Sequence, residues 1–385
     1  MSKRKVCVVV TARPSYSRIK TALQAIDNHP NLELQLVLSG SALIDRYGNA
    51  AKIIEQDGFK VTEKIYNILE GEAPAAMAKT TGIAILELST TFQNLQPDVV
   101  VTIADRFETI ATSIAASYQN IPLAHIQGGE VTGNIDEKVR HANTKFADIH
   151  LVASEESRER VIKMGESPDY VVNTGCPSMD LAKNVLENPE FNFDPFAKYG
   201  GVGPKISWKN GYLVVMQHSV TTEIKDVKKH IDVTLSAINE LKIPSFWFWP
   251  NVDSGSDSTS KGIRVFRQKS LSEHIHFFKN MEPQDFLILI KNSKCLIGNS
   301  SVGIRESSYL GTPVVNIGTR QKGRHRGKNV IDCDYIKESI KDSIMRQADH
   351  GNFESEQIYG DGCSGEKIAS SLASLDLRFH KTITY

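Results

Sequence analysis

The sequence has few cysteines and no excess of charge of either sign. The five cysteines are odd in number, widely spaced and free of Cys-x-x-Cys or His/Cys ligand patterns; they are Cys7, Cys176, Cys295, Cys333 and Cys363. This pattern argues against a disulfide scaffold and against a zinc site. Lys plus Arg and Asp plus Glu both total 45 residues, so no global basic field would attract nucleic acid or an anionic membrane. Any anion site must be local.

Long hydrophobic runs are also missing. The apolar run Val6–Val10 stops at Thr11–Pro14, which is too short for a signal peptide and far below the roughly 18 residues that cross a bilayer. No other segment reaches that length, so we expect a soluble protein of the reducing cytoplasm. The chain also lacks Gly-x-Gly-x-x-Gly and the P-loop pattern, which argues against a dinucleotide-binding fingerprint and a P-loop enzyme.

Short β-branched runs alternate with longer amphipathic stretches, the pattern of an α/β fold with parallel sheets and right-handed crossovers. The predicted strands of the first half are Val6–Val10, Leu34–Leu38, Val99–Ile103, Leu123–Ile126, Ile149–Val152 and Tyr170–Asn173. Those of the second half are Tyr212–Met216, Ser245–Trp249, Ile275–Phe278, Lys294–Ile297 and Val314–Ile317. The predicted helices include Ser17–Asp27, Ala75–Leu95, Thr109–Gln119, Lys138–Ala147, Glu155–Met164, Glu223–Leu241 and Pro283–Asn292.

A length of 385 residues and a 40% apolar content favour two domains. The mixed Pro, Gly, Asn and aromatic composition of 185–211 predicts a connection between a Rossmann-like domain at 1–184 and a second at 212–362. We expect the remaining segment, 363–385, to be helical and to pack back on the first domain. Two such domains facing each other leave a cleft, and the polar run Asp253–Gly262 is expected to be a mobile loop at its edge.

Polar residues follow most of the predicted strands, where ligands bind in open parallel sheets. Any surface loop begins with polar residues, so a single site of this kind means little, but the pattern occurs eight times. The residues are Thr11–Arg13, Gly40-Ser41, Asp105-Arg106, Gln127–Glu130, Gln217–Ser219, Pro250-Asn251, Asn299–Ser301 and Gly318–Arg320. We therefore expect a binding site at these strand ends.

The segment Gly298–Glu306 follows a strand and is predicted to open a helix, whose free amides and dipole suit a diphosphate. Ser300 and Ser301 add hydroxyl donors, and Arg320 is a possible partner for the same phosphates. An ordinary serine cap is the alternative interpretation. The basic run Arg320–Lys328 reads more simply as a solvated loop than as a nucleic-acid site, because no aromatic residues are interleaved with its charges.

Three acids and one histidine are candidates for chemistry on a ligand. Asp105 ends a strand, Asp136 and Glu137 follow a Gly-rich loop, and His218 ends a strand before a helix. The alternatives are a cap or salt bridge for Asp105, helix-start acids for Asp136 and Glu137, and a structural histidine.

These residues in this order resemble the hydrolysing UDP-N-acetylglucosamine 2-epimerases of sialic-acid biosynthesis, including the epimerase half of the bifunctional animal enzyme. The similarity runs from end to end of the chain. Its markers are Thr11–Tyr16, Tyr47–Asn49, Ala104–Phe107, His125–Gly133, Ile135–Glu137, Arg140–Ala142, Gly175–Pro177, Gln217-His218, Pro250-Asn251, Gly298–Glu306 and Gly311–Gly327.

The resemblance implies a two-domain fold of the glycosyltransferase-B type, with UDP held mainly by the second domain. It implies a UDP-sugar substrate, no metal or redox cofactor, and a homodimer or a dimer of dimers. The implied UDP-sugar contacts are Arg13, Ser17, Arg106, Gln127, His218, Asn251, Asn280, Ser300, Ser301, Glu306 and Arg320, with Glu306 on the ribose hydroxyls. The implied groups for the chemistry are Asp105, Glu130, Asp136, Glu137 and His218.

The implied reaction is elimination of UDP to 2-acetamidoglucal, followed by hydration to N-acetylmannosamine. The C2 proton is not acidified by a neighbouring carbonyl, so the bond from C1 to UDP must break well ahead. Which carboxylate removes the proton and which group returns it stays open.

One position departs from the family pattern. Many relatives carry Glu at the position of Gln127, and an amide cannot act as a base. Either Glu130, Asp136 or Glu137 takes that role, or the group recognised on the sugar differs. A related branch acts on 2,4-diacetamido-2,4,6-trideoxy sugars for legionaminic acid, and non-hydrolysing 2-epimerases share the fold and the elimination step. A glycosyltransferase and a non-catalytic sugar-nucleotide binding protein are further alternatives.

Overall fold

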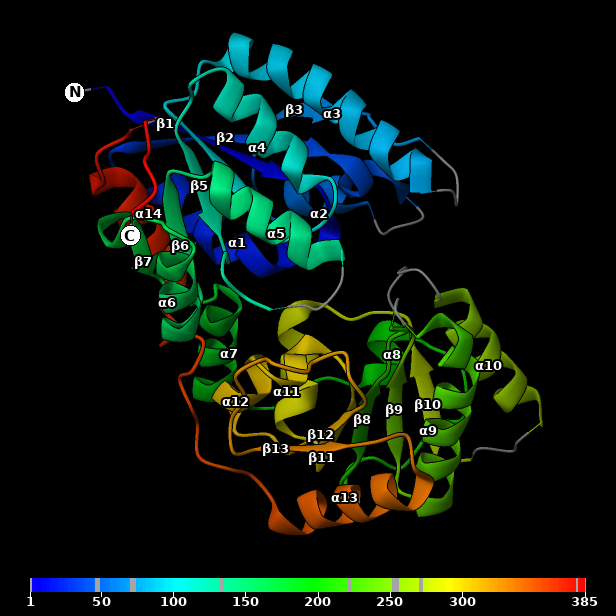
Figure 1. The fold of residues 1–385 in the computed structure, drawn as a ribbon. Coiled ribbons are helices and arrows are strands. Elements are labelled where there is room, and N and C mark those ends of the chain that lie inside the picture. The colour runs from blue at the N-terminus through cyan, green and yellow to red at the C-terminus, as the bar shows by residue number, and fades with distance from the viewer. Residues whose placement is uncertain are drawn as a thin grey trace. The chain divides into compact units, whose positions relative to one another are not determined.

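The structure, a computed structural model, describes residues 2–45, 49–69, 74–131, 135–220, 223–250, 256–269, 273–378 and 380–384. It consists of two compact units (Figure 1). The first comprises Met1–Asp180 together with Tyr359–Tyr385, and the second comprises Leu181–Ile358. Each unit is built on its own parallel sheet, which confirms the predicted α/β class with two parallel-sheet domains.

The first unit holds a seven-stranded sheet of order β3-β2-β1-β4-β5-β6-β7. Its strands are β1 (Arg4–Val10), β2 (Leu32–Ser39), β3 (Val61–Ile65), β4 (Val99–Ile103), β5 (Leu123–Ile126), β6 (Ile149–Val152) and β7 (Val171–Asn173). Its helices are α1 (Arg13–Asn28), α2 (Ala50–Gln56), α3 (Pro74–Leu95), α4 (Thr109–Tyr118), α5 (Ile135–Phe146), α6 (Glu155–Lys163) and α14 (Ser364–Ser374), with 3₁₀ turns at Gly40–Leu43 and Pro168–Tyr170.

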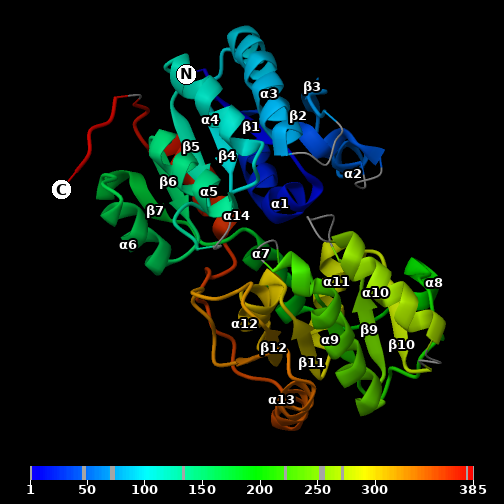
Figure 2. The same ribbon diagram turned by 45° about the vertical axis from the view of Figure 1, so that its right-hand side comes forward.

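Helices cover both faces of this sheet. Val6, Val8 and Val10 of β1 pack in one apolar cluster with α1, α2 and α14, whereas Cys7 and Val9 pack on the other face with α3 and α4. The views in Figures 1 and 2 place α3, α4 and α5 next to one another, and α1 beside α14. Because both faces are buried, the central strands are continuous apolar runs rather than alternating ones.

The second unit holds a six-stranded sheet of order β10-β9-β8-β11-β12-β13. Its strands are β8 (Leu213–Met216), β9 (Ser245–Phe248), β10 (Ile275–Phe278), β11 (Cys295–Gly298), β12 (Val314–Ile317) and β13 (Val330–Cys333). Its helices are α8 (Pro195–Tyr199), α9 (Val227–Leu241), α10 (Ser256–Lys269), α11 (Pro283–Lys291), α12 (Glu306–Leu310) and α13 (Lys337–His350), with 3₁₀ turns at Ile224–Asp226 and Ser301–Gly303. Helix α7 (Ser178–Glu187) spans the boundary between the units.

The sequence did not predict the two edge strands β3 and β13. Both are short and only partly buried, and both carry charged residues, such as Glu63 and Lys64 in β3 and Asp332 in β13. An edge strand is covered on fewer sides than a central one, so it needs no β-branched run for burial and leaves a weaker pattern in the sequence.

The segment 185–211 has more structure than the predicted connection. It belongs to the second unit, where Phe191 stacks against Trp208 with ring centroids 4.5 Å apart. Val202 pairs with Phe277, and each ring nitrogen of His276 lies 2.9 Å from a backbone carbonyl oxygen of this segment. The aromatic residues of this segment follow no regular period in the sequence, but in the structure they cover one end of the second sheet.

The chain returns to the first unit at Tyr359, earlier than the predicted start of the last segment at residue 363. Gly175 and Gly360 touch at this point, and a Cβ on either would lie 2.9 Å from the other's Cα. The Asp180 carboxylate accepts hydrogen bonds from the first backbone amides of α14, at Ser364 and Gly365. These contacts hold α14 against α1.

The predicted loop Asp253–Gly262 is wrong from residue 256 onward, since helix α10 begins there. The polar residues of this run belong to an amphipathic helix. The residue that follows the run, Ile263, is fully buried in the core of the second unit. Residues 253–255 lie outside the described ranges. Within the part of the chain that the structure describes, no helix is long and apolar enough to cross a membrane.

Candidate active site

In each unit the strand order reverses at one place, and a parallel sheet binds ligands at the carboxyl ends of the strands beside such a point. In the first sheet the reversal lies between β1 and β4, which lead to Arg13 and Asp105. In the second sheet it lies between β8 and β11, which lead to His218 and Ser300. The topology therefore brings candidate residues of the sequence to the switch point of each sheet.

Asp105 is held by a buried arginine. Its Oδ2 accepts a hydrogen bond from Nη2 of Arg140, a residue of α5 that is only 1% exposed. The Asp105 side chain itself remains 17% exposed. The preceding residue, Ala104, has a left-handed backbone with φ of 56°, which turns the chain sharply at the end of β4. A carboxylate paired with a cation yet open to solvent on one side can accept a proton from a ligand.

Gln127 ends β5 and lies inside the protein. It is fully buried and left-handed, with φ of 64°. Its Nε2 donates to Sγ of Cys176 at 2.8 Å, and its Oε1 accepts from Nη1 of Arg18 at 3.1 Å. Its backbone carbonyl accepts from Nη1 of Arg140. Gln127 thus connects the end of β5 to Arg18, Cys176 and Arg140.

The other predicted acids lie on the same loop and at the start of α5. Glu130 is buried, with 4% exposure. Asp136 and Glu137 are half-buried in the first turn of α5, where the helix dipole favours negative charge. Oε1 of Glu137 lies 3.4 Å from Nε2 of His141, one turn on.

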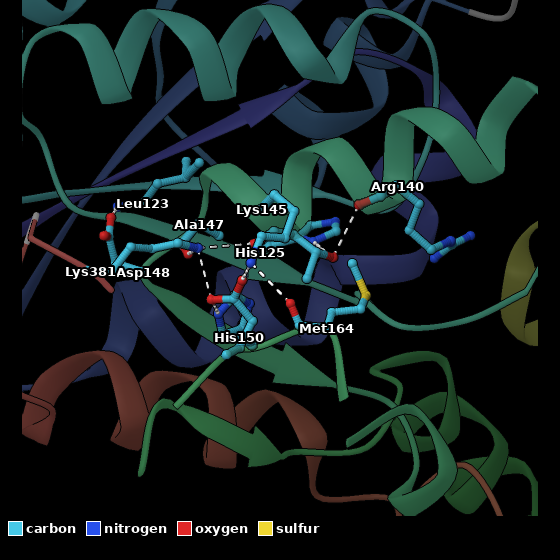
Figure 3. A network of polar contacts seen from close by, with 11 residues as sticks. Leu123, His125, Arg140, Lys145, Ala147, Asp148, His150, Met164 and Lys381 are labelled. Atoms are coloured by element: carbon cyan, nitrogen blue, oxygen red, sulfur yellow. Dashed lines mark hydrogen bonds and ion pairs between the residues drawn. The ribbon is translucent and has the colours of Figure 1, made fainter. Parts of the chain in front are cut away.

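Helix α5 is fixed by buried polar contacts that the sequence did not single out. Asn143 accepts a bond from Ser113 of α4 and donates one to Thr109, each 2.8 Å long. Burial lowers the pKa of His125 to about 3, so its ring is neutral at physiological pH. The ring donates from Nε2 to the Ala104 carbonyl at 2.9 Å, and Nδ1 contacts the Thr144 hydroxyl at 3.1 Å. Figure 3 shows this part of α5 with His125 beside it.

Arg13, Ser17 and Arg106 lie near the same edge of the first sheet. Arg13 and Ser17 are half-buried in the first two turns of α1, directly after β1. Nη2 of Arg106 pairs with buried Glu108 at 3.1 Å, and the Arg106 side chain is 35% exposed. The three residues thus lie in the segments that directly follow β1 and β4.

His218 is fixed by an amide from the neighbouring strand end. Its backbone N–H donates to Oδ1 of Asn299 at 2.7 Å, and Nδ2 of Asn299 donates back to the His218 carbonyl at 2.9 Å. Burial, together with the nearby charge of Arg320, lowers the pKa of His218 to about 3. Without a ligand the ring is therefore neutral, and it can offer an N–H donor rather than a full positive charge.

The predicted helix after β11 is a 3₁₀ turn, Ser301–Gly303, followed by the short helix α12. Ser300 caps this turn and accepts a bond from the Val302 amide at 3.4 Å. Glu306 is 7% exposed, and its Oε2 has no hydrogen-bond partner among the described residues. The same Oε2 lies 3.8 Å from Nε of Arg305, so the carboxylate takes part in a buried ion pair and still has room to accept a hydrogen bond.

Arg320 and Gln321 both donate to the carbonyl of Asn299, at 3.1 and 2.9 Å, and so link the end of β12 to the end of β11. In the basic run that follows, Arg326 pairs with Asp332 of β13. Asn280 is exposed just after β10. Asn251 and the Tyr47-Gly48 part of one marker lie outside the described residues.

Residues that the sequence interpretation missed are buried polar groups that support the site, above all Arg140, Asn143 and Asn299. Arg140 and Asn299 each belonged to a marker of the resemblance, and Asn299 also to the polar residues after the predicted strands, but neither was given a role. A charged residue on the inner face of a predicted helix was the available signal, because an unpaired buried charge is rarely tolerated. Among the described residues no cluster of three His, Cys, Asp or Glu side chains is arranged to hold a metal ion.

Two parallel sheets with polar side chains at both switch points define the class: a two-unit α/β protein that binds its ligand at strand ends. A family model described as UDP-N-acetylglucosamine 2-epimerase matches residues 24–373. The chain therefore belongs to the UDP-N-acetylglucosamine 2-epimerase family.

Several bacterial relatives resemble the chain over most of their length. A UDP-N-acetylglucosamine 2-epimerase of Neisseria meningitidis is 31% identical over 365 residues, 94% of this chain and 91% of the relative. A GDP/UDP-N,N'-diacetylbacillosamine 2-epimerase (hydrolyzing) of Campylobacter jejuni is 34% identical over 87% of this chain and 85% of its own. A UDP-N,N'-diacetylbacillosamine 2-epimerase (hydrolyzing) of Legionella pneumophila is 29% identical over 97% of both chains.

Solved structures share the fold. The UDP-GlcNAc 2-epimerase of Neisseria meningitidis bound to UDP-GlcNAc matches with a TM-score of 0.76 and 18% identity, covering 96% of this chain and 99% of that one. The enzyme of Methanocaldococcus jannaschii, in complex with UDP-GlcNAc and UDP, matches with a TM-score of 0.77, 17% identity and the same coverage. The chain thus has two parallel-sheet α/β domains that match the glycosyltransferase-B type fold of these epimerases.

Proposed function

We propose that this chain is a hydrolysing 2-epimerase, which converts UDP-N-acetylglucosamine and water into UDP and N-acetylmannosamine for the synthesis of sialic-acid-type sugars. The observation that carries the proposal is the Asp105 carboxylate, which pairs with buried Arg140 at the switch point of the first sheet while its side chain is 17% exposed. The family supports a 2-epimerase, and two relatives over 80% covered are described as hydrolyzing.

The first step is elimination. The bond between C1 and the UDP oxygen breaks, the electron pair leaves with UDP, and a carboxylate removes the C2 proton to give 2-acetamidoglucal. We assign the proton removal to Asp105. The neutral ring of His218 donates to the departing diphosphate, and Arg13 and Arg320 balance its charge.

The second step is hydration. Water adds its hydroxyl to C1, and a proton reaches C2 on the face opposite to the one from which it left. Glu130, Asp136 and Glu137 are the candidates to return it, because the Gln127 amide cannot carry a proton and both of its polar ends contact protein groups. Release of free sugar makes the reaction irreversible.

UDP is assigned to the second unit. Ser300 and Ser301 offer hydroxyls beside the diphosphate, and Glu306 accepts from the ribose hydroxyls through Oε2, which pairs with Arg305 but makes no hydrogen bond to the described residues. Arg106, Ser17, Asn251 and Asn280 complete the proposed UDP-sugar contacts.

Proton NMR in deuterated water tests this function. With UDP-N-acetylglucosamine, the protein should release free UDP and N-acetylmannosamine carrying deuterium at C2. A mixture of UDP-sugars would instead establish the non-hydrolysing reaction, and sugar transfer with retained C2 configuration would establish a transferase. Omission of any divalent cation, with a chelator present, should leave the rate unchanged.

A second substrate has specific support. The diacetylbacillosamine 2-epimerases among the relatives act, by their descriptions, on a sugar with two acetamido groups. The same NMR experiment with a UDP-linked 2,4-diacetamido-2,4,6-trideoxy sugar decides between the two. A kcat/KM at least about tenfold higher for that sugar would reassign the substrate, because the difference reports transition-state binding.

A further inference from the structure

We infer that Arg140 is a positioning residue, which holds the Asp105 carboxylate and the loop that begins at Gln127 in the geometry needed for C2 proton transfer. The inference rests on the proposed function, since it gives Arg140 a role in that same step. Arg140 itself touches neither sugar nor UDP in this assignment.

The guanidinium of Arg140 joins the ends of two neighbouring strands. One terminal nitrogen, Nη2, donates to Oδ2 of Asp105 after β4. The other, Nη1, donates to the backbone carbonyl of Gln127 after β5. A planar guanidinium offers two donors in a fixed geometry, so it sets the spacing of the two loops as well as neutralising a charge.

Both loops begin with a residue in a strained backbone conformation. Ala104 and Gln127 are left-handed without being glycine, a conformation that persists in other residues only where the surrounding structure holds it. The carbonyl of each accepts a bond from a buried side chain: Nε2 of His125 bonds Ala104, and Arg140 bonds Gln127. The strain is therefore maintained by buried groups at the position where Asp105 must be presented.

The helix that carries Arg140 is itself fixed. Asn143 ties α5 to α4 through Ser113, and Thr144 contacts the ring of His125. Figure 3 shows the Arg140 side chain extending away from the cluster at the other end of α5, where Lys145 lies. Arg140 is thus rigid enough to impose its geometry on Asp105, and Lys145 provides a matched control five positions along the same helix.

The test compares Arg140→Met and Arg140→Lys with Lys145→Met. Lys145 also pairs with a buried carboxylate, Glu166, at 2.5 Å, but at the opposite ends of the strands. Arg140→Met should lower kcat at least about a hundredfold with KM changed less than about threefold, because the lost contact acts on the transition state. Lys145→Met should keep kcat within about threefold while lowering the melting temperature.

Two readouts separate positioning from a loss of stability. With substrate deuterated at C2, the isotope effect on kcat should rise in Arg140→Met, because proton removal becomes slower, and stay at the wild-type value in Lys145→Met. Arg140→Lys keeps the charge but not the two-pronged geometry, so it should recover only part of the rate. If Arg140→Met does not fold, the isotope effect in Arg140→Lys gives the answer.

Amide hydrogen exchange keeps the inference separate from the proposed function. In Arg140→Lys, exchange of the Ala104 and Gln127 amides should speed up at least about tenfold, since their loops open more easily. This readout requires no turnover. An inactive wild-type protein would overturn the proposed function alone, whereas unchanged exchange, or equal losses of rate in the Arg140 and Lys145 variants, would overturn the positioning role.

Discussion

Two carboxylates of the first unit, the partly exposed Asp105 and the buried Glu166, are each paired with a cation from α5, but they lie at opposite ends of the strands. Asp105 follows the carboxyl end of β4 and has one side open. Glu166 precedes β7 and is 4% exposed, with donors from Lys145, His150 and Lys381 around it. Figure 3 shows these three donors together.

The comparison shows that one helix, α5, provides cations for two different kinds of ion pair. At the amino ends of the strands, the three donors occupy the Glu166 carboxylate, so no ligand can reach it. These contacts therefore stabilise the fold. At the carboxyl ends of the strands, Arg140 donates one bond to each of two loops, and the Asp105 side chain is 17% exposed, which suits the role we propose for it. Parallel sheets bind their ligands at the carboxyl ends of the strands, where Asp105 lies.

The largest expected effect is at Asp105. Asp105→Asn should lower turnover at least about a hundredfold, because an amide cannot take the C2 proton. The unfolding free energy should fall by only about 2 kcal/mol, since Arg140 loses a charged partner at a partly exposed site. Kinetics at several temperatures and denaturant melts check both numbers. Near-normal turnover would place the base elsewhere and remove the contrast with Glu166.

His218 extends the comparison to the second sheet. His218→Ala should lower turnover at least about a hundredfold while the fold is kept, since a donor to the leaving diphosphate is lost. Because its pKa of about 3 makes the free ring neutral, an uncharged donor should partly replace it. His218→Gln should therefore be clearly more active than His218→Ala in steady-state assays. Equal rates for the two variants would argue for a protonated ring instead.

Glu166→Gln should affect stability and leave the chemistry intact. Burial alone would raise the pKa of Glu166, but bonds from His150, Lys145 and Lys381 outweigh it and lower the pKa to about 2. The folded-state pKa lies below the ordinary value, so the stabilisation is present above about pH 4.5 and lost as the pH falls toward 2. We expect Glu166→Gln to cost about 3 kcal/mol at pH 7.

Urea melts at a series of pH values check this prediction. The wild-type protein should lose stability between about pH 5 and pH 2 more steeply than the variant, because only the wild type must protonate Glu166. At temperatures where both are folded, the variant should keep its kcat. A variant that folds normally but has lost its turnover would mean that the Glu166 contacts at the amino ends of the strands also support the reaction.

The smallest effect is expected from the C-terminal tail. Nζ of Lys381 donates to Glu166 at 2.8 Å and to the Ala147 carbonyl just after α5 at 2.7 Å. Lys381→Ala should lower the unfolding free energy by about 1 kcal/mol without changing kcat. Lys367→Ala, which breaks an exposed pair with Asp361, is the control and should stay within about 0.5 kcal/mol of wild type. Thermal melts that rank the two the other way would contradict the proposed anchoring of the tail.

The sequence by itself determined the class of fold and which polar residues follow the central strands. Central strands such as Val99–Ile103 and Leu123–Ile126 agree residue for residue with the structure, because a strand buried on both faces must be a continuous apolar run. The polar residues after those runs marked the ligand edge, because all strands of a parallel sheet end on the same side. This local information needs no knowledge of strand order.

Only the tertiary structure decided the strand order and the partners of the buried polar groups. No local sequence pattern predicts that Arg140 pairs with Asp105, 35 positions away. None predicts that Asn299, after β11, bonds His218, after β8. The sequence assigned Gln127 to the sugar, whereas the structure buries its amide between Arg18 and Cys176. Such pairings depend on which strands become neighbours, and the burial of the whole chain fixes that arrangement rather than any single segment.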